Sequence, residues 1–165
     1  MPTDFFALLH RDHMDLQHDL DALLDPTTTR LELRAALDGV RLGLTAHAEA
    51  AEIVLARFES VSALRPLVAH AAAAHVSQEG ALSELVSSRP GTSAWRETAR
   101  YLRGLVCAHA THEEATLLPA LREYPADYSM LAGEFATQRL RQLAMLQPSA
   151  PVFSPYAFEA FAACH

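Results

Sequence analysis

Four histidines are spaced so that they could meet at a single metal site. They are His13, His47, His75 and His109, and each falls in a different predicted helix. If these helices run alternately up and down with short loops, each histidine lies a similar number of residues from the same end of a bundle. The spacing therefore predicts that the four imidazoles lie at one level inside the bundle.

A ring of inward-facing histidines favours metal binding over a structural role. A neutral imidazole carries one hydrogen-bond donor and one acceptor, so burying it without partners costs free energy. A single buried histidine usually meets this need with a backbone carbonyl. Several at one level, together with a carboxylate, form a ligand set that suits iron, zinc, copper or nickel. The alternative is a hydrogen-bonded polar layer of the core that holds no metal.

Glu113 is the carboxylate that best shares the direction of these histidines. It follows His109 by four residues, and a four-residue step in an α-helix turns the side chain by about 40°, whereas a five-residue step turns it by about 140°. Glu114 therefore needs side-chain reach or a local bulge in the helix to join the site. By the same rule His70 and His75, which are five residues apart, do not share a face. His70 is a candidate ligand that the spacing does not favour.

Apolar residues at steps of three and four predict the helices that position these side chains. The stripes cover residues 6–23, 33–58, 68–85 and 95–117. The second stripe is the most regular and places His47 in the bundle seam. Thr29 and Glu32 form a capping-box pattern before it. His10 and His18 fall on a more polar face and are expected at the surface or behind the ligands.

The chain is predicted to be all-α and to have two parts. Residues 1–124 are expected to form an up-down four-helix bundle, and residues 125–165 a C-terminal helical extension packed on it. The predicted apolar stripe of a further helix at 127–146 consists of Met130, Phe135, Leu140 and Leu143. This helix carries no expected metal ligand. A Phe- and Ala-rich tail at 156–165 is a candidate homodimer contact.

Composition limits the classes of partner. Half of the 165 residues are hydrophobic, which indicates a folded globular protein. The net charge is −7 with neutral histidines, which argues against nucleic acid and anionic membranes as partners but not against a cation. No apolar stretch is long enough to span a bilayer, and no secretory signal is visible. Since only two cysteines are present, neither a disulfide framework nor a thiolate zinc site is expected, and the cytoplasm is the expected compartment.

Several of these segments resemble the hemerythrin-like, or HHE cation-binding, domain family. The fourth-helix motif is the most specific, because paired glutamates followed by Leu-Leu-Pro repeat the family pattern. The similar segments, which together span roughly the first 120 residues, are Leu9 to His13, His47 with Glu52 and Leu55, His75, and His109 with Glu113, Glu114, Leu117, Leu118 and Pro119.

The resemblance implies an up-down four-helix bundle that holds a non-haem di-iron centre with histidine ligands and bridging carboxylates. Carried onto this chain, it implies that the iron ligands are His13, His47, His75 and His109, with Glu113 or Glu114 as a bridge. Such proteins bind or react with oxygen species, so dioxygen, nitric oxide and peroxide are the implied small-molecule partners.

This chain departs from the family pattern at two places. Family members usually have a bridging glutamate four residues after the second-helix histidine, where this chain has Ala51, and Glu52 lies one position off the inward stripe. The third-helix histidine pair is commonly four residues apart, whereas His70 and His75 are five apart. A bridging carboxylate screens the repulsion between two cations. We therefore expect an asymmetric, labile or mononuclear centre, with the second ion position the weaker one.

Three classes of function follow from the sequence. The first is a metal-binding protein that handles dioxygen, nitric oxide or iron. The second is a peroxide-consuming di-iron enzyme, which needs the same ligands, an open coordination position and an access path. The third is a metal-free helical interaction module with a vestigial site. Zinc is the alternative to iron, because three histidines and one carboxylate satisfy its preferred coordination.

Overall fold

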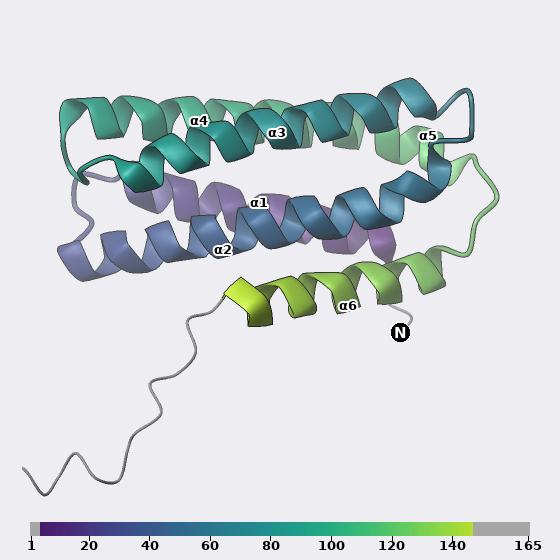
Figure 1. Cartoon of the computed structure of the whole chain (residues 1–165), viewed down its shortest axis with the longest axis horizontal. Helices are drawn as coiled ribbons and strands as arrows, with labels where there is room; N and C mark the ends of the chain where they lie inside the picture. The colour runs from purple at the N-terminus through teal and green to yellow at the C-terminus, as the bar shows by residue number, and fades with distance from the viewer. Residues whose placement is uncertain (1–3, 147–165) are drawn as a thin grey trace, which may run out of the picture.

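A computed structural model describes residues 4–146, and over that range the chain is all-α (Figure 1). The six α-helices are α1 (Phe5–Leu24), α2 (Arg30–Leu55), α3 (Arg65–Ser87), α4 (Ser93–His112), α5 (Leu118–Arg122) and α6 (Tyr128–Leu146). A 3₁₀ turn η1 (Ala56–Phe58) extends α2, and a π-helical turn η2 (Glu113–Leu117) joins α4 to α5.

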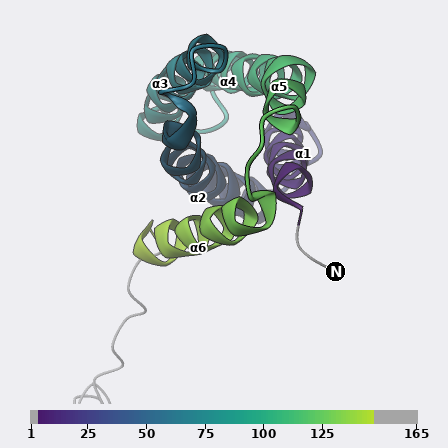
Figure 2. The ribbon, with the colours of Figure 1, turned by 90° about the vertical axis from the view of Figure 1, so that its right-hand side faces the viewer.

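The helices α1 to α4 form the predicted four-helix bundle. Each contacts its neighbours in the order α1, α2, α3, α4 and back to α1, and the end view shows these helices as a closed ring (Figure 2). The predicted capping box at Thr29 and Glu32 is present and begins α2. Asp4 and Thr92 cap α1 and α4 in the same way, because each side chain accepts a hydrogen bond from a backbone N–H of the first turn.

The bundle core consists of two apolar clusters separated by a polar layer. One cluster surrounds Phe5, Leu55 and Leu121, and the other surrounds Leu20, Leu85 and Trp95. The buried polar and charged side chains belong to neither cluster; they are Asp12, His13, His47, His75, Gln78, His109 and Glu113. The predicted single level of histidines is therefore confirmed, with dry packing on both sides of it.

Helix α6 lies outside the ring and packs along α1 and α2 (Figure 2). The stripe expected for it was partly wrong. Phe135 is buried as predicted, but Met130 and Leu140 are 51% and 66% exposed, and the residues buried beside Phe135 are Leu131 and Ala132. The reason is the helical period: the step from Leu131 to Phe135 stays on one narrow face, whereas the steps of five in the predicted stripe rotate away from it. The candidate dimer contact at 156–165 lies outside the described residues.

Candidate metal centre

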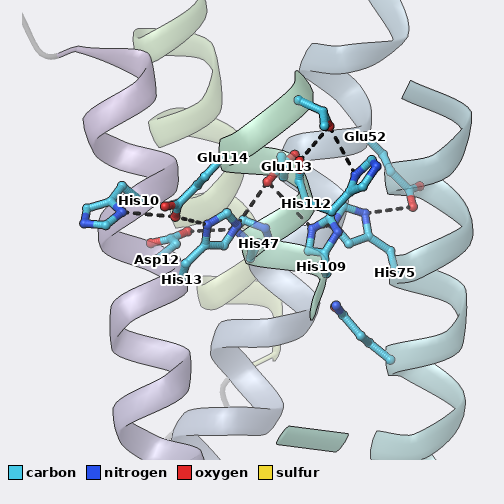
Figure 3. Close-up of polar contacts among 12 residues, drawn as sticks. His10, Asp12, His13, His47, Glu52, His75, His109, His112, Glu113 and Glu114 are labelled. Atoms are coloured by element: carbon cyan, nitrogen blue, oxygen red, sulfur yellow. Dashed lines mark hydrogen bonds and ion pairs between the residues drawn. The ribbon is translucent and has the colours of Figure 1, made fainter. Parts of the chain in front are cut away.

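The four predicted histidines meet in the middle of the bundle, one from each helix (Figure 3). Their ring centroids lie between 4.6 and 6.3 Å apart for the five measured pairs. Each ring is buried. Side chains that are far apart in the sequence are thus brought within the distance at which they could share an ion.

Within the described residues, one group has the geometry to hold a metal ion. His13, His47, His109 and Glu113 each offer one ligand atom, and these atoms all lie within 4.8 Å of one another. Several of the inward-facing atoms have no hydrogen-bond partner, although they are buried; these are Nε2 of His13, Nε2 of His47 and both carboxylate oxygens of Glu113. Unpaired buried lone pairs are costly in a purely structural layer, and a cation would satisfy them.

The π-helical turn explains how adjacent glutamates serve one histidine. In a regular α-helix, neighbouring side chains point about 100° apart, but η2 begins at Glu113 and widens the backbone there. Glu113 Oε2 lies 3.0 Å from Nε2 of His13, at ion-pair distance but outside hydrogen-bond geometry, and Glu114 Oε1 lies 2.9 Å from Nδ1 of the same ring, within hydrogen-bond geometry. The local bulge that the spacing required for Glu114 is therefore present. Its carboxylate approaches the outer nitrogen of His13 and is not among the group that could hold an ion.

A buried carboxylate on α1 orients His47. Nδ1 of His47 lies 3.4 Å from Oδ2 of Asp12, which also accepts a 2.7 Å hydrogen bond from Nε of Arg139 on α6. A carboxylate that accepts the outer N–H of an imidazole fixes the ring so that its other nitrogen faces a metal. Neither Asp12 nor Arg139 was predicted from the sequence to support a ligand. A signal for Asp12 was present, because the buried residues Phe5, Leu9, Asp12 and Leu16 follow steps of four, three and four.

The other two histidines are supported less firmly. Nε2 of His75 lies 3.1 Å from Nε2 of His109. Nδ1 of His75 lies 3.5 Å from Oε1 of Glu52 without meeting hydrogen-bond geometry, and Nδ1 of His109 has no partner. Glu52 is half exposed and approaches His75 from outside the bundle, and Ala51 is fully buried and offers no ligand atom.

The pKa directions follow this arrangement. Burial lowers the pKa of His75, and the neighbouring His47 and His109 lower it further, to about 3. Burial also lowers the pKa of His109, to about 4, although Glu113 acts against it. For His13 burial is outweighed by its two carboxylate neighbours, and its pKa is raised. Burial would raise the pKa of Glu113, but the His13 contact and the surrounding imidazoles lower it to about 2.

Two further predicted or expected residues lie away from this group. His70 is exposed, and its ring packs against that of His112 at a centroid distance of 3.9 Å and an interplanar angle of 39°, so the structure does not bring it to the other histidines. His10 is also exposed, as expected, and its Nδ1 lies 3.0 Å from Oε1 of Glu114. Gln78, which was not predicted from the sequence, is buried one turn after His75, and its amide donates to the carbonyl of Leu105.

The donor set fits a borderline transition-metal ion. Nitrogen ligands bound at about 2.1 Å to one tetrahedral ion lie about 3.4 Å apart, and the ligand atoms of His13, His47, His109 and Glu113 all lie within 4.8 Å of one another. Neutral imidazoles with a buried, ionised carboxylate suit iron, zinc or copper, and the absence of thiolates at the site disfavours a soft-metal cluster. The residues could therefore hold a metal ion.

Comparisons with models of known families, with curated proteins and with solved structures give no match to this chain. Among the helices described, none is both long enough and apolar enough to pass through a membrane.

Proposed function

We propose that this protein binds non-haem iron and belongs among hemerythrin-like proteins, with a role in binding or sensing oxygen species or iron. The observation that carries the proposal is the buried convergence of His13, His47, His109 and Glu113, in which the inward atoms of His13, His47 and Glu113 lack hydrogen-bond partners. The sequence resemblance to the HHE domain supports iron, because the histidines that carry the resemblance are the ones that converge.

The chain's own residues prepare this site in two ways. Asp12 and Glu114 accept from the outer nitrogens of His47 and His13, so that the inner nitrogens face the centre. The apolar clusters above and below exclude water and strengthen every interaction with an ion. When bound, iron would supply redox chemistry towards oxygen species.

The proposed centre is asymmetric. One position has three histidines and one glutamate, whereas the side at His75 lacks a bridging carboxylate, because position 51 is alanine and Glu52 points to the outer nitrogen. We propose that one ion binds well and a second binds weakly between His75 and His109. The same three-histidine, one-carboxylate group is the specific observation that favours zinc as the alternative ion.

The test is the metal content of the purified protein after expression in iron-replete medium. We expect close to one iron per chain in the wild type, and its loss in His47→Ala with helix content retained. His18→Ala is the matched control, since His18 is exposed and does not belong to the group that could hold an ion. Unchanged metal content in His47→Ala would show that the centre is elsewhere.

The remaining functions are separated by two further outcomes. A wild type that binds neither iron nor zinc would identify the metal-free interaction module with a vestigial site. Turnover of hydrogen peroxide by the iron-loaded protein, absent in His47→Ala, would identify a peroxide-consuming enzyme rather than a binding or sensing protein.

A further inference from the structure

A pocket opens on the outside of the bundle next to His75. It has a volume of about 310 Å³ and lies between the end of α2 and the first half of α3. Its lining includes Glu52, Ile53, Ala56, Val68, Ala72 and His75. Among these residues only His75 also belongs to the histidine layer, so the pocket reaches the centre through this one ring.

The two ring nitrogens of His75 face in opposite directions, one towards the histidine layer and one towards the pocket. Nε2 faces inward, 3.1 Å from Nε2 of His109, whereas Nδ1 lies 3.5 Å from the carboxylate of Glu52, which lines the pocket. The ring is 1% exposed, and Nδ1 has no hydrogen-bond partner. The unpaired nitrogen and the neighbouring carboxylate oxygen are two ligand atoms, and a bound cation would give the buried nitrogen the partner that it lacks.

Glu52 differs from the carboxylates behind the other histidines. Asp12 is held by Arg139, and the carboxylate of Glu114 is shared with His10. Within residues 4–146, Glu52 makes no salt bridge to an arginine, and it remains 48% exposed. Glu49 and Glu79 lie close enough that, after burial, they contribute to raising its pKa. Three carboxylates therefore lie close together beside this pocket, and within the described residues none of the three forms a salt bridge to an arginine. Such a concentration of negative charge attracts metal ions.

We propose that the α2–α3 pocket is the loading site of the metal centre, where Glu52 and Nδ1 of His75 take up a divalent cation before it reaches the inner ligands. This inference rests on the proposed metal-binding function and adds a route to it. The step is a ligand exchange without redox change: the ion gives up bound water for the Glu52 carboxylate and the imidazole. The outer nitrogens of His13 and His47 cannot serve in this way, because Glu114 and Asp12 already occupy them, and His109 does not line this pocket.

The experiment is the rate at which metal-free protein takes up Co²⁺, followed by stopped-flow absorbance of the bound ion. We expect Glu52→Gln, which keeps the shape but removes the charge, to load about tenfold more slowly than the wild type. Its final Co²⁺ content at saturation should match the wild type, because Glu52 is not in the inner group. Raising the ionic strength should slow the wild type more than Glu52→Gln.

Two more variants make the test specific. Glu97→Gln removes the same charge from an exposed position near the start of α4 and should load at the wild-type rate. Ala72→Leu fills the pocket without changing charge and should also slow loading. Wild-type loading rates in both Glu52→Gln and Ala72→Leu, or equal slowing in Glu52→Gln and Glu97→Gln, would overturn the loading site. A wild type that takes up no Co²⁺ would instead overturn the proposed function, and this inference with it.

Discussion

The two halves of the histidine layer differ in how firmly they are held. On α1 and α2, the outer nitrogens of His13 and His47 face carboxylates that are themselves fixed by a second partner. On α3 and α4, the outer nitrogen of His75 has only a long contact to Glu52, and that of His109 has none. The first half is therefore preorganised for a ligand, and the second half is not.

This difference accounts for the pKa directions. Carboxylate neighbours favour a charged imidazole, so the pKa of His13 is raised despite its burial. At His75 and His109 burial outweighs the opposing effect of Glu113 and keeps the imidazoles neutral, with pKa values of about 3 and 4. A neutral imidazole is the form that binds metal. The imidazoles on α3 and α4 can thus bind a metal ion without competition from protons, whereas those on α1 and α2 are held in a fixed orientation by their carboxylate partners.

The largest effect that we expect from this comparison is acid instability of the metal-free protein. His75 and His109 have native pKa values below the unfolded value near 6.5, so the unfolded state binds more protons as the pH falls. Their contribution to stability is present above pH 6.5 and is lost as the pH falls towards 4 and then 3. Each imidazole contributes up to about 1.4 kcal/mol per pH unit in that window. Urea unfolding of metal-free protein at pH 7, 6 and 5 measures this loss.

The comparison also predicts which histidine controls that loss. His75→Leu should flatten the dependence of unfolding free energy on pH below 6.5, whereas His18→Ala, at an exposed position, should not. The raised pKa of His13 acts in the other window, because its contribution is present below pH 6.5 and is lost as the pH rises through the native value. If His75→Leu keeps the wild-type slope, the second half of the layer is not the acid-sensitive one.

Much of the fold and of the inner site could be predicted because both follow from helical periodicity. Each of His13, His47, His75 and His109 lies on an apolar stripe, and their similar spacing from the helix ends sets their level. The four-residue step likewise predicted that Glu113 accompanies His109. These are local rules that a single sequence expresses directly.

What could not be predicted depends on contacts between distant elements. The Asp12 carboxylate accepts a hydrogen bond from Arg139, which lies 127 residues later in the sequence, on α6. No periodic pattern encodes that pairing, and the predicted stripe of α6 was too loose to reveal which face carries Arg139. The outer position of Glu52 and the contact of the His70 ring with His112 likewise depend on how α2, α3 and α4 are packed.

The second largest expected effect is that of a new carboxylate placed at the weaker half of the centre. Ala51 is fully buried one turn after His47, so Ala51→Glu would project a carboxylate from α2 towards the layer. We expect the metal content to rise towards two ions per chain. Without metal, the buried charge should destabilise the fold by about 2 kcal/mol or more.

Ala51→Gln is the matched control, because it has the same size but cannot bridge two cations as an ionised group. It should destabilise the fold through overpacking without raising the metal content. Equal metal content in Ala51→Glu, Ala51→Gln and the wild type would show that the missing carboxylate is not what limits the second position.

The smallest expected effect concerns the better-held half. Asp12→Asn keeps the shape of the side chain but weakens its acceptance of the N–H of His47 and its ion pair with Arg139. Removing such a support for a metal-ligating histidine typically lowers metal affinity by 10- to 100-fold, which is about 1.4 to 2.7 kcal/mol. Competition of a colorimetric chelator for Co²⁺ measures the affinity. Asp15→Asn is the control, since Asp15 is exposed on the same helix and the group that could hold an ion does not include it.

Affinity and loading together distinguish the two halves. Asp12→Asn should release Co²⁺ faster while taking it up at the wild-type rate, because Asp12 acts on the bound geometry and does not line the pocket at His75. Glu52→Gln should show the reverse, with slow uptake and an unchanged final content. If Asp12→Asn binds Co²⁺ as tightly as Asp15→Asn, the contacts that join Arg139, Asp12 and His47 stabilise only the packing of α6. The asymmetry of the centre would then arise from Ala51 alone.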